Sequence, residues 1–146
     1  MLKKKTKTGK LYLLPGATSS RVAEAGAAMA EPVSKPVSMR RVRSLGEQYE
    51  ITSRDFAEFL EVTPKTLTRW NRNGDSLSRQ QSDRIAVLEA IFALGGRVLG
   101  SREHVREWLR NPVLYLNDET PLELLKTESG RRRVENALRQ IEFGMY

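Results

Sequence analysis

Six residues between positions 63 and 72 have the side-chain types and the spacing to contact DNA. Arginine and lysine donate hydrogen bonds to guanine or to phosphate, and threonine hydroxyls can do either. Five of the six share the outward face of a predicted helix, no acidic residue joins them there, and free N–H groups at the start of that helix would add a phosphate site. The sequence therefore predicts a DNA-binding surface made of Thr63, Lys65, Thr66, Thr68, Arg69 and Arg72. The alternative is a structural hairpin with a solvated basic face.

A helix-turn-helix pair is predicted to position these side chains. The first helix should end at Leu60, and after a three-residue turn the second should begin at Pro64, because a hydroxyl followed by proline is a strong helix start. The second helix should end at Gly74. The pair also needs a small residue where the two helices approach each other, which is Ala57, and an apolar residue in the turn, which is Val62. Leu67 and Trp70 are the apolar residues that anchor the second helix.

Every other segment from residue 39 onward also has helical signals, so the predicted fold class is all-α. Apolar residues recur three and four positions apart, and no segment alternates with the period of a strand. A long helix from Ser78 is expected to end at Gly95–Gly96, and a full capping box is expected at residues 120–123. The remaining predicted caps are Thr52 or Ser53, Ser101 and Thr127.

Charge and composition divide the chain into three parts. Residues 1–43 carry ten Lys and Arg against two acidic residues, a net +8, whereas the other 103 residues carry 15 basic and 16 acidic side chains, a net −1. We predict a basic, flexible tail over 1–38, a helix-turn-helix bundle over 39–98 and a small helical domain over 99–146. The tail would either add salt-dependent attraction to nucleic acid or act as a solubilising leader.

The sequence contains no recognisable catalytic motif. It has no cysteine, and His104 is the single histidine, so no zinc site, metal site or cysteine nucleophile is predicted. Its glycines fit no phosphate-binding loop, so no cofactor is predicted. The absence of cysteine fits a reducing cytoplasm, and no apolar run is long enough for a membrane span or a signal peptide. We expect a binding protein with no catalytic residues.

The predicted helix pair resembles Xre-type, lambda-repressor-like helix-turn-helix domains. The residues that carry the resemblance are Ala57, Leu60, Val62, Thr63, Thr66, Leu67, Arg69, Trp70 and Gly74. The chain departs from that pattern at Glu61, where the family usually has glycine in a left-handed turn. Glutamate there would cost about 1 kcal/mol, unless the turn differs.

The C-terminal part resembles the toxin-binding domain of Xre/MbcA/ParS antitoxins. The distinctive elements are the Pro-Leu-Glu-Leu-Leu-Lys-Thr run from Pro121 and the Ile-Glu-Phe-Gly run from Ile141. A departure is the loop over 115–119, where the family commonly has glycines. The resemblance implies a RES- or ParT-like toxin that consumes NAD or transfers ADP-ribose, and a C-terminal end that blocks the toxin's NAD site.

Two features near the C-terminus suit a partner. Large apolar side chains at the end of a chain either pack against the protein's own core or bind a partner, because a chain terminus without such contacts is usually poorly ordered. The arginine run over 131–133 is either a solvated helix face or a contact for acidic groups. The predicted toxin-binding residues are Arg131, Arg132, Phe143, Gly144, Met145 and Tyr146.

Two functions remain open at this stage. The first is an antitoxin that neutralises its toxin, represses its own operon and joins a larger toxin–antitoxin assembly. The second is a stand-alone repressor whose C-terminal helices only dimerise it. Both require operator DNA and a homodimer, because one recognition helix spans too few base pairs for useful specificity.

Overall fold

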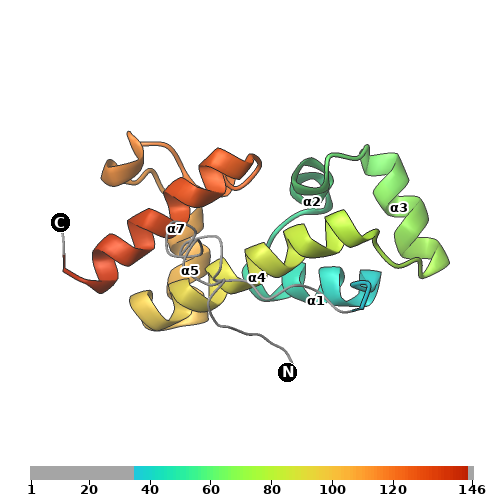
Figure 1. The fold of residues 1–146 in the computed structure, drawn as a ribbon, viewed down its shortest axis with the longest axis horizontal. Helices are drawn as coiled ribbons and strands as arrows, with labels where there is room; N and C mark the ends of the chain where they lie inside the picture. The colour runs from blue at the N-terminus through green and yellow to red at the C-terminus, as the bar shows by residue number, and fades with distance from the viewer. Residues whose placement is uncertain (1–34, 145–146) are drawn as a thin grey trace, which may run out of the picture.

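The computed structural model describes residues 35–144, which form an all-α fold (Figure 1). The predicted fold class is confirmed, since these residues contain seven α-helices and no strand. Most of the predicted tail, and Met145 and Tyr146 at the C-terminus, lie outside the described residues. The elements are α1 (Met39–Tyr49), α2 (Ser53–Leu60), α3 (Pro64–Asn73), α4 (Arg79–Leu99), α5 (Arg102–Leu109), the 3-10 turn η3 (Leu114–Leu116), α6 (Pro121–Leu124) and α7 (Glu128–Glu142).

Each α-helix begins at a serine or threonine that caps it. In all seven, the hydroxyl accepts a hydrogen bond from the backbone N–H three residues later, which satisfies one of the unpaired groups of the first turn. This explains why the predicted helix starts are confirmed. The caps are Ser38, Thr52, Thr63, Ser78, Ser101, Thr120 and Thr127.

Two predicted helix-end details are wrong. The long helix does not end at Gly95–Gly96 but continues to Leu99, and Gly100 takes the left-handed cap with φ 102°. Gly95 lies where α5 and α7 approach, and a Cβ there would be 3.2 Å from Cγ2 of Val105. The capping box at Thr120 is one-sided, because the carboxylate of Glu123 accepts from Lys126 instead.

The buried helix α4 links the two ends of the molecule. Its apolar residues belong to one continuous core, and it packs against α2 on one side and against α5 and α7 on the other. Figure 1 shows α1, α2 and α3 around one end of α4 and the later helices around its other end. The predicted boundary between residues 98 and 99 therefore falls at the end of a helix that both parts share.

The folded part begins before the predicted boundary at residue 39. Val37 is buried, its N–H donates to Oγ of Ser82 at 2.9 Å, and its carbonyl accepts from the N–H of Leu77 at 2.9 Å. The buried Ser82 hydroxyl thus pairs with a backbone group of the incoming chain. Residues 35–38, which belong to the predicted flexible tail, include a core residue.

Gly130 lets the start of α7 approach the end of α6 closely. A Cβ at this position would lie 1.8 Å from the carbonyl oxygen of Leu124. That oxygen is backbone, so the clash has no flexible side chain to relieve it. The tight approach allows Arg131 to donate to the carbonyl of Leu125 at 2.9 Å.

Replacing Gly130 by alanine should destabilise the protein, although alanine in a helix normally stabilises by up to about 1 kcal/mol. We expect a loss of roughly 1–3 kcal/mol in the free energy of unfolding in urea, because the backbone must move to admit the methyl group. Gly96→Ala is the matched control, since a Cβ there would meet nothing within 4 Å and should be neutral or stabilising. Equal stability of the two variants would contradict the packing described.

Candidate functional site

The outward face of α3 carries three basic side chains exposed to solvent. Lys65, Arg69 and Arg72 are exposed, as is Thr68 between them. None of the ion pairs found over residues 35–144 involves these three cations. The structure therefore gathers four of the six predicted DNA-binding residues on one accessible helix face.

Thr63 and Thr66 differ from the other four because each is engaged in capping α3. The Oγ1 atom of Thr63 accepts from the N–H of Thr66 at 3.1 Å and lies 2.9 Å from the Thr66 hydroxyl oxygen. The N–H group of Thr66, one of the two that the sequence predicts to be free at the start of the helix, is thus already bonded. These two threonines shape the start of the helix, next to the cations.

The turn between α2 and α3 contains a residue in the left-handed backbone conformation, which glycine adopts most easily. Glu61 has φ 59° and ψ 44°, so the turn keeps the expected geometry and a glutamate adopts it. Its carboxylate lies 3.2 Å from the guanidinium of Arg84 on α4. The packing residues of the pair are also in place, since Ala57 and Leu67 are buried and Val62 and Trp70 pack partly buried against the core.

The end of α7 is open to solvent at the other end of the molecule. Phe143 is 66% exposed, and Gly144 has φ 72° with nothing within 4 Å of a Cβ built on it. Figure 1 shows this end far from α3. An exposed aromatic side chain beside a freely turning glycine suits insertion into a partner.

The predicted arginines are not brought to this end. Arg131 is about 18 Å from Phe143 along the helix, given its 12-residue separation, and its guanidinium donates to Leu125 within the fold. Burial, together with the nearby charge of Arg84, lowers the pKa of Arg131 below its ordinary value. Arg132 is exposed and pairs with Glu128 at 3.1 Å. Of the two, Arg132 is the one available to a partner.

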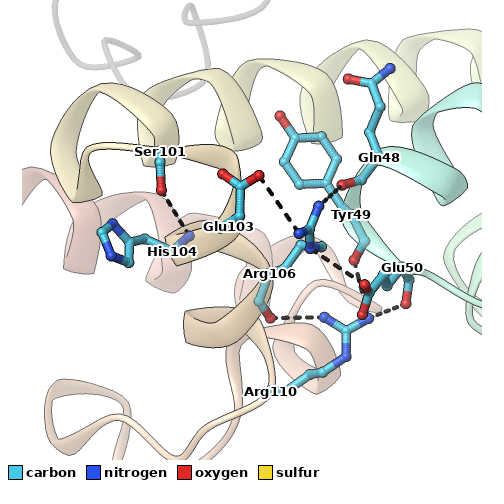
Figure 2. A network of polar contacts seen from close by, with 8 residues as sticks. All are labelled: Gln48, Tyr49, Glu50, Ser101, Glu103, His104, Arg106 and Arg110. Carbon is cyan, nitrogen blue, oxygen red and sulfur yellow. Dashed lines mark hydrogen bonds and ion pairs between the residues drawn. The ribbon is translucent and has the colours of Figure 1, made fainter.

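Two arginines at the C-terminal end of α5, Arg106 within the helix and Arg110 as its C-cap, join that helix to the end of α1 (Figure 2). Arg106 donates to the carbonyl of Gln48 at 3.0 Å, and Arg110 donates to the carbonyls of Tyr49 and Glu50. The last carbonyls of a helix lack partners within it and carry the negative end of the helix dipole. The α5 arginines supply both hydrogen bonds and positive charge to the α1 end.

Lys126 joins α2 to the segment between α6 and α7. Its Nζ lies 2.6 Å from Glu58, 2.8 Å from Glu123 and 3.5 Å from Asp55, and the side chain is only 15% exposed. Burial alone would lower the pKa of Lys126, but the hydrogen bonds to Glu123 and Glu58 outweigh it and raise that pKa above its ordinary value. The ammonium is therefore charged at neutral pH and fixes α2 against the C-terminal helices.

The sequence did not predict the roles of Arg106, Arg110 and Lys126. It pointed to Tyr115 only as part of an unusual loop. Tyr115 and its neighbour Leu114 are exposed large apolar residues of η3. Their signal was an apolar run, Leu114 to Leu116, directly before Asn117 and Asp118, two residue types that tolerate positive φ and both adopt it. The contacts of Arg106 and Arg110 with α1, and of Lys126 with α2, left no signal, because those partners are distant in sequence.

The described residues provide no metal-binding cluster of three or more His, Asp or Glu side chains. His104 is exposed, with Nδ1 2.9 Å from the carbonyl oxygen of Leu99. In this part of the chain no helix combines the length and the apolar character that crossing a membrane requires.

The C-terminal part of the chain is similar to a known protein family. Residues 88–144 match the family described as "Antitoxin Xre/MbcA/ParS C-terminal toxin-binding domain". A protein of Yersinia enterocolitica named "Antitoxin Xre" is 24% identical over 145 residues, which cover 97% of this chain and 93% of that protein. The family match begins inside α4. Together the two matches support a toxin-neutralising antitoxin of the Xre/MbcA/ParS type.

Replacing Lys126 by methionine should destabilise the protein by about 1–2 kcal/mol at pH 7. The change leaves three carboxylates close together, one of them on the half-buried Asp55, but two are solvent-exposed, which reduces the loss. Since the folded pKa is raised, the lysine's contribution is complete below about pH 10.4, the pKa of lysine in an unfolded chain, and is lost as pH rises through the folded value.

Urea denaturation at pH 7 and pH 9 measures this effect, and the difference between wild type and variant should be the same at both. Arg132→Met is the control, because it removes an exposed pair and should cost no more than about 0.5 kcal/mol. A Lys126 variant no less stable than this control would show that the lysine does not hold the helices together.

Proposed function

We propose that this Xre/MbcA/ParS-type antitoxin neutralises a RES- or ParT-like toxin that consumes NAD or transfers ADP-ribose, and that it represses its own operon. In this proposal the C-terminal end blocks the toxin's active site and α3 binds operator DNA. The observation that carries it is the exposed Phe143 at the open end of α7, on the opposite side of the molecule from α3.

The chain end is suited to fill a pocket. A toxin that binds NAD has a concave site, and an inhibitor blocks it most directly by occupying the mouth. Phe143 offers an aromatic anchor of the kind that dominates interface energies. Gly144, in the left-handed region, lets the chain leave the helix direction without steric cost. Met145 and Tyr146 follow in the sequence and extend the proposed contact.

The face of α3 is suited to DNA. Three exposed cations and Thr68 lie on a helix that follows α2 after a three-residue turn, as in a helix-turn-helix. Operator specificity would come from two copies, one recognition helix in each half-site, so we propose a homodimer that assembles further with the toxin. Both tasks are binding tasks without catalysis, and both partners belong to the cytoplasm.

The family match favours an antitoxin over a plain repressor. In a stand-alone repressor the C-terminal helices would only join two copies, and Phe143 would then be covered by a second copy. The toxin-binding family match over residues 88–144 favours a toxin as the occupant instead.

A protein that stops after Glu142 should fold and bind DNA but no longer protect cells from the toxin encoded beside it. Stopping there keeps the contacts of Glu142 with Arg97 and Arg139, so the melting temperature should stay close to that of the full chain. Growth of a bacterial host that co-expresses toxin and antitoxin measures protection. Full protection by the shortened chain would exclude the proposed role of the C-terminal end.

The repressor alternative predicts a different result for the same shortened chain. If Phe143 joins two copies, light scattering of the antitoxin alone will show a lower mass, and DNA binding will weaken at the same time. Retained dimer mass with loss of protection would favour the antitoxin function.

Arg69→Ala should weaken binding to the upstream operator by about 1–3 kcal/mol if the arginine contacts a base, and toxin neutralisation should survive. Lys65→Ala should weaken binding at all sequences and lower its salt dependence if it contacts phosphate. Arg132→Ala, which removes an exposed arginine of α7, is the control. A mobility shift on the promoter that is the same for Arg69→Ala and the control would remove α3 from the DNA-binding surface.

A further inference from the structure

Two large apolar side chains, Leu114 and Tyr115, project from the segment between α5 and α6. Leu114 is 77% exposed and Tyr115 is 41% exposed. With Phe143, they are the large apolar side chains exposed among the described residues, and all three lie within residues 88–144. Isolated exposed apolar residues are common, but an adjacent pair on a small domain more often marks a contact.

The pair lies on a short hairpin over residues 113–119, whose backbone is held by hydrogen bonds. Val113 donates to the carbonyl of Glu119 at 3.1 Å, and the N–H of Asp118 donates to the carbonyl of Val113 at 3.0 Å. Leu116 is buried in the core, and its carbonyl accepts from Arg133 at 3.3 Å. The exposure of Leu114 and Tyr115 is thus built into the fold, and a partner would lose little affinity to ordering them.

We propose that Leu114 and Tyr115 form a second contact with the toxin, beside the contact made by the chain end. This inference rests on the proposed function. Two side chains cover far less than the roughly 800 Å² that each partner buries in a stable interface, so they must extend a larger one. The hairpin packs on α7 near Arg133, about 15 Å along the helix from Phe143, and Figure 1 shows this segment and the end of α7 on the side of the molecule away from α3.

The hairpin also defines the chemistry of the surface that it would meet. Leu114 requires an apolar hollow, and the tyrosine hydroxyl requires a hydrogen-bonding group at its edge. Asp118 is exposed beside them, and no ion pair within residues 35–144 involves it, so a basic group on the toxin would complement it. The unusual loop over 115–119 would then help to select one toxin over its relatives.

The test is the dissociation constant between the full-length antitoxin and the purified toxin encoded beside it, measured by biolayer interferometry. The double variant Leu114→Ser/Tyr115→Ser should bind at least tenfold more weakly, and it should stay folded with a melting temperature close to that of wild type, because Leu114 is mostly exposed and Tyr115 lies at the surface, partly covered. The conservative pair Leu114→Met/Tyr115→Phe keeps the apolar surface and should bind within about threefold of wild type.

Three results would overturn the inference. An unchanged dissociation constant for the serine variant removes the hairpin from the interface, and if the chain shortened after Glu142 still loses affinity, the proposed function stands without it. A lower mass of the free serine variant in light scattering would assign the hairpin to a contact between copies of this chain. Failure of the wild-type antitoxin to bind the toxin overturns both this inference and the proposed function.

Discussion

The burial of α4 is the constraint on which the rest of the structure depends. Ile85, Leu88, Ile91, Phe92 and Leu94 are almost completely buried, so the helix is covered along most of its length by elements from both sides of the chain. Neither the α1–α3 group nor the α5–α7 group can bury its own apolar faces without it. The two candidate surfaces, α3 and the end of α7, therefore sit at opposite ends of a shared rod rather than on independent domains.

Polar contacts fix the relative position of the two groups more precisely than apolar packing does. The α5 arginines satisfy the carbonyls at the end of α1, and Lys126 draws α2 toward α6 and α7. These contacts are directional, whereas the core is not, so they select one arrangement among those that bury the same area. A toxin that binds the α7 end would thus meet a body in which the orientation of α3 is already set.

Local sequence signals predicted most of the helices. They failed where the structure depends on contacts between residues distant in sequence. Hydroxyl caps and the Thr63–Pro64 pair gave the helix starts, because capping is a contact between neighbours in sequence. Gly95 and Gly96 suggested a helix end, yet α4 continues past them to Leu99, and Gly95 gives room for α5 to pack against it. Val37 gave no periodic signal, and its burial depends on Ser82, 45 residues away. The exposed face of α3 was predictable, whereas the engagement of Arg131 within the fold was not, since its acceptor is a backbone carbonyl.

We propose that one molecule presents a DNA-binding face on α3 and a toxin-binding end on α7 that do not overlap. The most direct test measures the mass of the species formed when the purified toxin is added to the antitoxin already bound to operator DNA, by light scattering at a fixed salt concentration. The account predicts a ternary complex that contains DNA, antitoxin and toxin together. Release of the DNA as each antitoxin takes up a toxin, with no ternary species at any ratio, would contradict it.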